Sequence, residues 1–128
     1  MPEANYPSDL KYHEEHVWAR IDGDVATCGI TWYAQEQLGE IIAFETAEIG
    51  QEMRKDHPYA EVESVKSVSD VIAPLSGEIV AVNEALASTP EVINEDPYSE
   101  GWMVRTRLSS ASEVDALMDA AAYRESVK

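Results

Sequence analysis

Basic residues are scarce in this chain, and their scarcity limits the classes of molecule that can bind it. The 128 residues include 9 Lys and Arg against 25 Asp and Glu, so the formal net charge is −16 at pH 7. A protein this acidic repels the phosphate groups of nucleic acids and of anionic membrane surfaces. The composition therefore argues against both as partners and favours basic surfaces on other proteins.

Cysteine and catalytic motifs are nearly absent as well. Cys28 is the single cysteine, so no disulfide can form within the chain, and its place in an expected strand favours a small core side chain. His13 and His16 lie three residues apart, unlike the four-residue spacing of a helical zinc pair, and His57 precedes a proline in an expected loop. With no glycine-rich phosphate loop and no G-x-S-x-G motif, we expect neither a metal site nor an enzyme.

Long apolar runs are also missing. No segment approaches the roughly 20 apolar residues that a membrane-spanning helix needs. The first twenty residues lack an apolar segment and carry the acidic residues Glu3, Asp9, Glu14 and Glu15. These features argue against a secretory signal and against an organellar transit peptide. We expect a cytoplasmic protein of bacterial type, or a mitochondrial matrix protein if the chain is a trimmed mature form.

The chain does contain many short β-rich segments, separated by turn residues. Hydrophobic residues make up 45% of it, which is enough for a core. Strands are expected over residues 17–21, 25–30, 41–44, 60–65, 68–73, 78–82 and 101–108, and Asp22-Gly23 marks a hairpin between the first two. The pattern predicts a single, mainly β domain over residues 1–128, a small β-sandwich or barrel with a core over about 10–108.

A few helical signals interrupt the strands. Thr31 suits the N-cap of a helix through Leu38, which Gly39 would end, and Thr89-Pro90 suits another helix start. Near the C-terminus, a helix is expected over about 111–124. Its signals are a capping-box pair, Ser110 and Glu113, and an apolar stripe of Val114, Leu117, Met118 and Ala121.

Lys66 is the one cationic residue between Lys55 and Arg105. It lies between two expected strands, so their pairing would place it at a hairpin tip. The simplest interpretation is a solvated turn lysine. The alternative is a lysine displayed for covalent modification, because a modifying enzyme must enclose and deprotonate an amine whose usual pKa is about 10.4.

An ordered set of motifs surrounds Lys66 and continues on both sides of it. Its central part is Glu63-Ser64-Val65-Lys66-Ser67, Ser69-Asp70-Val71 and Ala73-Pro74-Leu75-Ser76-Gly77-Glu78-Ile79-Val80. On the N-terminal side it includes Tyr12, His16, Trp18, Gly29-Ile30-Thr31 and Leu38-Gly39-Glu40-Ile41. On the C-terminal side it includes Ile93-Asn94, Pro97-Tyr98 and Gly101-Trp102. From about Leu10 to the C-terminal helix, the chain resembles the glycine cleavage system H proteins, which are lipoyl carriers.

This resemblance implies a barrel-sandwich hybrid of the lipoyl-domain type and a non-catalytic, monomeric carrier. Lys66 would hold lipoate in amide linkage within a motif made by Glu63, Ser64, Val65 and Ser67. The lipoyl arm would take an aminomethyl group from a pyridoxal-phosphate glycine decarboxylase to a tetrahydrofolate-dependent aminomethyltransferase. A flavin-dependent dihydrolipoyl dehydrogenase would then reoxidise it, and lipoate-attaching enzymes would be further partners.

The chain departs from the family pattern at two positions. Trp32 replaces a polar residue, and an exposed tryptophan there would change the local surface. Val17 replaces an N-terminal glutamate that lies near the loaded arm in the family. A cationic amine held away from water needs an anionic partner. We therefore expect Asp70 to hold the loaded arm. Glu15 or Glu14 would replace the missing glutamate, with His16 alongside.

Three alternatives remain open at this point. Biotin carriers usually have Met on both sides of the modified lysine, and lipoyl domains of 2-oxoacid dehydrogenases usually have Asp-Lys-Ala. Here the neighbours of Lys66 are Val65 and Ser67. The third alternative is an acidic adaptor domain that carries no modification.

Overall fold

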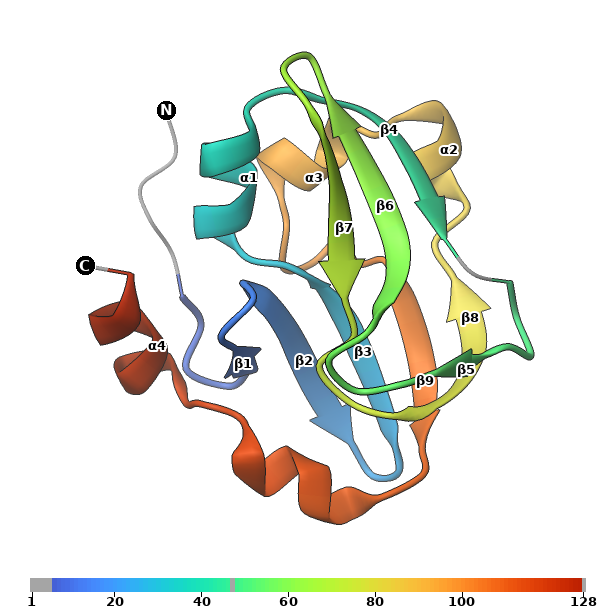
Figure 1. Ribbon diagram of the computed structural model, residues 1–128, viewed down its shortest axis with the longest axis vertical. Coiled ribbons are helices and arrows are strands. Elements are labelled where there is room, and N and C mark those ends of the chain that lie inside the picture. The colour runs from blue at the N-terminus through green and yellow to red at the C-terminus, as the bar shows by residue number, and fades with distance from the viewer. Residues whose placement is uncertain (1–5, 47, 128) are drawn as a thin grey trace.

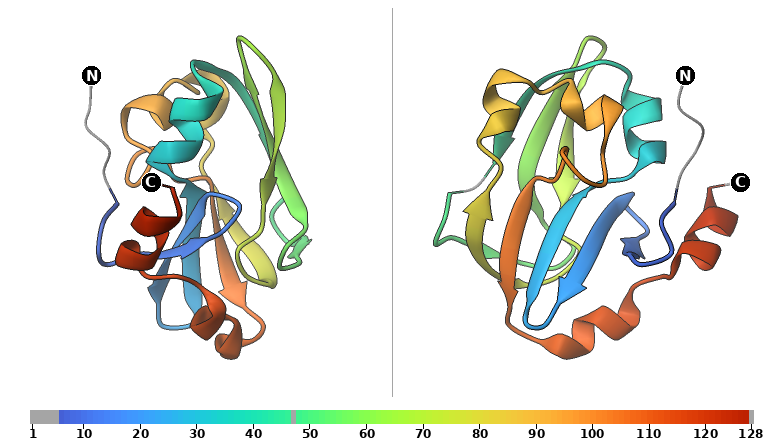
Figure 2. Two further views of the ribbon diagram at one scale, coloured as in Figure 1. Left: turned by 60° about the vertical axis from the view of Figure 1, so that its left-hand side comes forward. Right: turned by 180° about the vertical axis from the view of Figure 1, so that it is seen from behind.

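The computed structural model describes residues 6–46 and 48–127, which form two facing β-sheets (Figure 1). The larger sheet has the strand order β1-β2-β3-β9-β8-β5 and the smaller one β4-β6-β7. The strands are β1 (Lys11–His13), β2 (Val17–Asp22), β3 (Val25–Ile30), β4 (Ile41–Thr46), β5 (Glu52–Met53), β6 (Pro58–Ser64), β7 (Val68–Ile72), β8 (Gly77–Val82) and β9 (Val104–Leu108). This architecture confirms the predicted mainly β sandwich, and Figure 2 shows its two layers from other sides.

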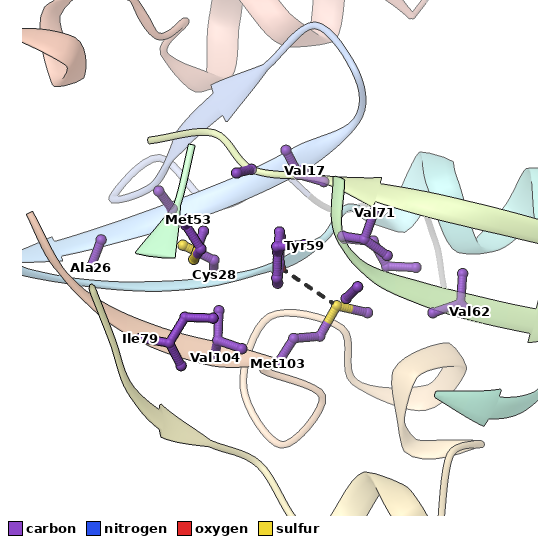
Figure 3. Packing of buried hydrophobic residues seen from close by; sticks show 14 of the residues in the cluster. Val17, Ala26, Cys28, Met53, Tyr59, Val62, Val71, Ile79, Met103 and Val104 are labelled. Carbon is purple, nitrogen blue, oxygen red and sulfur yellow. Dashed lines mark hydrogen bonds between the residues drawn. The ribbon is translucent and has the colours of Figure 1, made fainter. Parts of the chain in front are cut away.

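The main core fills the space between the two sheets. Tyr59 and Val62 from β6 face Cys28 from β3 and Met103 beside β9, and the Tyr59 hydroxyl donates a hydrogen bond to the Met103 sulfur at 3.9 Å (Figure 3). Burial raises the pKa of the Cys28 thiol to about 12. Cys28 is therefore an inert core side chain, as expected from its strand position.

Two local sequence signals form the structures they predict. The β2–β3 hairpin forms where Asp22-Gly23 predicted it: Asp22 pairs with Val25, and the turn residues are Gly23 and Asp24, of which Gly23 has a φ of +65° that side chains disfavour. Thr31 caps α1 (Trp32–Leu38) by accepting a hydrogen bond from the Ala34 amide at 3.2 Å. Gly39 follows α1 with a φ of +82°, so its predicted role as the helix stop is confirmed.

Two other predicted boundaries shift. The segment after Thr89-Pro90 becomes helical at α3 (Val92–Glu95), and a further short helix, α2 (Ala85–Ser88), precedes it without a clear sequence signal. The last strand, β9, begins at Val104 rather than residue 101. Gly101 instead packs against the backbone of Asp96, whose carbonyl oxygen a Cβ there would approach to 2.6 Å.

The single helix expected over about 111–124 is wrong, because the C-terminus forms two shorter helices. These are the 3₁₀ helix η1 (Ala111–Ala116) and α4 (Ala120–Ser126). Between them, Met118 exchanges two backbone hydrogen bonds of 2.8 Å with Tyr12, which requires an extended backbone. The capping box is also absent, since the Glu113 carboxylate accepts hydrogen bonds from the Ser76 amide and hydroxyl at 2.7 and 3.0 Å. The predicted apolar stripe is therefore divided. Val114 and Leu117 pack on the main core, Met118 packs on a second core described below, and Ala121 is exposed.

A second core, here called the aromatic cluster, joins both ends of the chain to the outer face of the larger sheet. It consists of Tyr6, Leu10, Tyr12, Trp18, Tyr98, Ala120 and Tyr123. Along β2, Val17 and Ala19 contribute to the main core while Trp18 contributes to the aromatic cluster, as strand alternation requires. The Tyr12 and Tyr123 rings stack with centroids 4.8 Å apart, and this contact fixes α4.

Candidate modification site and the adjoining cleft

Lys66 lies at the tip of the β6–β7 hairpin, as the sequence predicted. The two strands pair up to Glu63 and Val68, and the turn between β6 and β7 has Lys66 at its centre. In Figures 1 and 2 this hairpin reaches furthest beyond the rest of the molecule. The Lys66 side chain is exposed, so an enzyme can enclose the hairpin tip from several sides.

Ser64 fixes the backbone of this turn. Its hydroxyl oxygen accepts hydrogen bonds from the amides of Lys66 and Ser67, at 3.2 and 3.1 Å, and donates to the Ser67 carbonyl. The Val65 amide donates to the Glu40 carbonyl at 3.1 Å, which ties the turn to the segment after α1. The motif around Lys66 therefore has a physical role, because Ser64 holds the turn while the side chains of Val65, Lys66 and Ser67 remain exposed.

The ammonium group of Lys66 rests at the C-terminal end of α1. Its Nζ donates a hydrogen bond of 3.3 Å to the Gln37 carbonyl, where the helix carries partial negative charge. Gly39 lies under the same side chain, and a Cβ there would come within 3.2 Å of the Lys66 Cε. The contact is exposed to solvent and easily replaced, so the lysine remains available.

A cleft of about 210 Å³ adjoins this position, between α1, β7 and the turn that precedes β2. Its lining residues are Glu15, His16, Val17, Ile30, Tyr33, Ala34, Gln37, Leu38, Val62, Ser69, Asp70, Val71 and Ile72. Three predicted arm-docking residues, Glu15, His16 and Asp70, thus lie around one cleft. Gln37 links the cleft to the lysine, because it lines the cleft and accepts the Lys66 hydrogen bond.

The structure separates Glu15 from Glu14. Glu15 lines this cleft, whereas Glu14 lines a different hollow with His13, Lys55 and Asp56. In that second hollow, His13 Nε2 lies 2.6 Å from the Asp56 carboxylate, and His13 Nδ1 accepts a hydrogen bond from the Glu15 amide. His13 thereby sets the turn that presents Glu15, and Glu14 is not among the residues lining the cleft.

The two departures from the family pattern are both accommodated by packing. Val17 lines the inner wall of the cleft and belongs to the main core, so the carboxylate on this side comes from Glu15 instead. Trp32 is half-buried against the aromatic cluster, and its amide donates a hydrogen bond to the Tyr98 hydroxyl at 2.8 Å. Much of the Trp32 ring packs inward and the rest stays exposed, so its effect on the local surface stays a prediction.

His16 has an unusual environment on the cleft wall. Its backbone has a φ of +69°, its carbonyl accepts a hydrogen bond from the Thr31 amide, and its ring lies 4.6 Å from the Tyr33 ring. Its Nδ1 lies 2.8 Å from the Tyr123 hydroxyl. Burial lowers the pKa of His16, while the charge of Glu15 acts in the opposite direction. Sequence reasoning missed Tyr123, because no local pattern connects it with His16.

The comparisons with known proteins decide the family. The family model described as "Glycine cleavage H-protein" matches residues 10–128. The chain belongs to the glycine cleavage H-protein family. This finding confirms the resemblance drawn from the sequence, and the family is that of the lipoyl carriers of the glycine cleavage system. The other carrier classes are disfavoured, because the match extends far beyond the lysine hairpin.

Individual relatives agree with this family. The chain is 51% identical over 120 residues to the glycine cleavage system H protein of Symbiobacterium thermophilum, covering 94% of each chain. It is 47% identical over 124 residues to that of Halalkalibacterium halodurans, covering 97% of each. The crystal structure of the H protein from Mycobacterium marinum matches with a TM-score of 0.85 and 37% identity, over 93% of this chain and 96% of that one.

The relatives named here are bacterial proteins. Among the residues that the structure describes, no helix is both long and apolar enough to span a bilayer. The same residues contain no group of three or more His, Cys, Asp or Glu side chains placed to hold a metal ion.

Proposed function

We propose that Lys66 carries lipoate in amide linkage and that this chain acts, as one domain, as the lipoyl carrier of a cytoplasmic glycine cleavage system. The observation that carries the proposal is the geometry of the hairpin. A single exposed lysine lies at the tip of a turn fixed by Ser64, directly beside a cleft with carboxylates at its edge.

The cleft suits a lipoyl arm chemically. Its inner wall is apolar, with the side chains of Val17, Ile30, Leu38, Val62 and Val71. An alkyl chain that ends in sulfur gains from contact with such a wall. Glu15 and Asp70, both exposed, add negative charge at the entrance. When attached, lipoate supplies a disulfide that accepts the aminomethyl group and two electrons, so the protein itself needs no catalytic group.

Glu15 and Asp70 have a specific role in this proposal. An aminomethyl group on sulfur is a cationic amine on a carbon that water can attack, so the carrier must hold it against solvent between enzymes. Two carboxylates from β7 and the turn before β2 provide the counter-charge, and the apolar wall excludes water. Glu15 thereby replaces the glutamate that the family usually has at the position of Val17.

The proposed partners follow from the reaction cycle of the family. They are a pyridoxal-phosphate glycine decarboxylase, a tetrahydrofolate-dependent aminomethyltransferase, a flavin-dependent dihydrolipoyl dehydrogenase and the enzymes that attach lipoate. Each must bind around the exposed hairpin, whose flanking side chains Val65 and Val68 are 63% and 57% exposed. The net charge of −16 favours basic surfaces on these enzymes.

Replacing the lysine tests the proposal. In a glycine cleavage assay reconstituted with the other components, Lys66→Arg should abolish activity, because arginine keeps the charge but offers no amine for acylation. Lys55→Arg is the matched control and should retain full activity and modification. Activity of Lys66→Arg at the control level would rule out Lys66 as the attachment site.

A further inference from the structure

His16 stands at the junction of the cleft and the aromatic cluster, within a chain of short hydrogen bonds. Its Nδ1 lies 2.8 Å from the Tyr123 hydroxyl, which lies 2.8 Å from the Thr31 hydroxyl. The Thr31 hydroxyl oxygen also accepts a hydrogen bond from the Ala34 amide at the start of α1. Three elements that are distant in sequence therefore meet at one hydroxyl on α4.

The donors and acceptors at Thr31, Tyr123 and His16 decide which of these groups donates in each hydrogen bond. Thr31 is fully buried, and the Ala34 amide can only donate to it, so the Tyr123 oxygen is the one acceptor available for the Thr31 proton among the described contacts. Tyr123 has a single proton, which must then point to His16 Nδ1. His16 Nδ1 is consequently an acceptor, and the ring proton lies on Nε2.

Protonation of His16 would disturb this arrangement. A proton on Nδ1 would have to be donated to Tyr123, which would then donate to Thr31. The Thr31 hydroxyl would be left with a buried proton and no acceptor within the described contacts. The burial that lowers the pKa of His16 acts in the same direction.

The charge state of His16 matters because of what surrounds it. The groups that face or neighbour it are Glu15 and His13 on its own segment, Tyr33 on α1, Tyr123 on α4 and, across the cleft, Asp70 on β7. No lysine or arginine lines the cleft within the described part of the chain. A positive imidazole would therefore be the one cation in a cleft whose negative charge comes from two carboxylates.

We infer that Tyr123 is a positioning residue that holds His16 as a neutral imidazole, so that the cleft keeps its negative charge for a cationic amine. Tyr123 acts through His16 and does not line the cleft itself. This inference rests on the proposed function for the identity of the cation. The state of His16 does not depend on it and can be measured on protein that carries no lipoate.

The first test is the tautomer of His16 in the unmodified protein. Nitrogen-15 NMR at pH 7.5, with His16 assigned by comparison with His16→Gln, should show a neutral ring with the proton on Nε2. A proton on Nδ1, or a charged ring at that pH, would overturn the inference. Because the sample carries no lipoate, this result stands apart from any failure of Lys66 to be modified.

The second test removes one hydroxyl from the aromatic cluster. Tyr123→Phe should raise the titration midpoint of His16 by about one pH unit, since the donor that stabilises its neutral form is lost. The matched control is Tyr12→Phe, which removes the neighbouring hydroxyl that donates to the Pro7 carbonyl and should leave the midpoint unchanged. An unchanged midpoint in folded Tyr123→Phe would refute the role of Tyr123.

The third test needs no substitution at Tyr123 and remains available if that variant does not fold. In the loaded carrier without its transferase, the amine should be lost roughly three- to tenfold faster as His16 gains its proton, at a pH that burial shifts below the usual histidine pKa of about 6.5. Glutamine in the His16→Gln variant cannot be protonated, so this acceleration should disappear. Any change in the rate of amine loss that comes from protonation of the carboxylates should remain. An acceleration of equal size in His16→Gln would contradict the inference. If the protein were not lipoylated at all, only the proposed function would fail.

Discussion

The lysine hairpin and the aromatic cluster are built on opposite principles, although both adjoin the same cleft: β7 of the hairpin lines it, and Tyr123 of the cluster contacts it through His16. The turn at Lys66 is fixed by hydrogen bonds that the Lys66 and Ser67 amides donate to the nearby Ser64 hydroxyl, and Val65 and Val68 remain mostly exposed. In the aromatic cluster, Tyr12 and Tyr123 come from the two ends of the chain and are fully buried. The hairpin thus presents a group to other proteins, whereas the cluster holds His16 in place on the cleft wall through Tyr123.

This difference predicts that substitutions in the two regions have separable effects. Changes at the hairpin should affect modification and partner binding with little loss of stability. Changes in the aromatic cluster should affect stability and the cleft while leaving Lys66 accessible.

The largest difference should appear in the free energy of unfolding. Tyr123→Ala removes a buried ring that stacks on Tyr12, and it should cost about 3–5 kcal/mol. Val65→Ala, at the exposed hairpin, should change stability by no more than about 0.5 kcal/mol. Urea unfolding of both variants measures this difference. Equal losses would show that the two regions do not differ as described.

The holding of the loaded arm should depend on the cleft carboxylates. Asp70→Asn and Glu15→Gln should each speed the spontaneous loss of the amine by about tenfold, if each contact contributes about 1.4 kcal/mol. Glu14→Gln is the matched control, because Glu14 lines a different hollow. Decay of the loaded carrier without its transferase measures the effect. If the control variant decayed as fast as Glu15→Gln, the cleft would not be the holding site.

The smallest effect should be the electrostatic contribution to partner binding. The outer face of the hairpin sheet carries Glu45, Glu61 and Glu63, with Glu45 and Glu61 directly opposite each other. Association with the decarboxylase should slow as salt rises, because screening acts beyond roughly 8 Å at physiological ionic strength.

A pair of charge substitutions locates this effect. Glu61→Gln should slow association more than Asp115→Asn, since Asp115 is exposed on η1 at the end of the molecule away from the hairpin tip (Figure 1). Stopped-flow association rates across a salt series provide the measurement. A rate that is flat in salt, or equal slowing by the two substitutions, would remove this sheet face from the account.

The sequence predicted the features that depend on neighbouring residues. Asp22-Gly23 specified a hairpin, Thr31 and Gly39 specified the ends of α1, and the isolated Lys66 between two β-rich segments specified a turn tip. Each of these depends on contacts within a few residues. Periodicity and turn chemistry describe such contacts well.

The failures involve contacts between distant segments. The apolar stripe near the C-terminus was consistent with one helix, but the backbone pairing of Met118 with Tyr12 breaks it. The contact of Tyr123 with His16 spans 107 positions in the sequence, and no local pattern contains it. Likewise, only the fold shows that Glu15 and Asp70 share a cleft while Glu14 lies outside it.

The most direct test of the account is to locate lipoate on the chain. Protein from cells supplied with lipoate should show, by intact mass and peptide mapping, one lipoyl group per chain on the peptide that contains Lys66. The Lys66→Arg variant from the same cells should show none. A lipoyl group on Lys11 or Lys55, or on Lys66→Arg protein, would contradict the account, as would a wild-type chain that stays unmodified beside lipoylated enzymes in those cells.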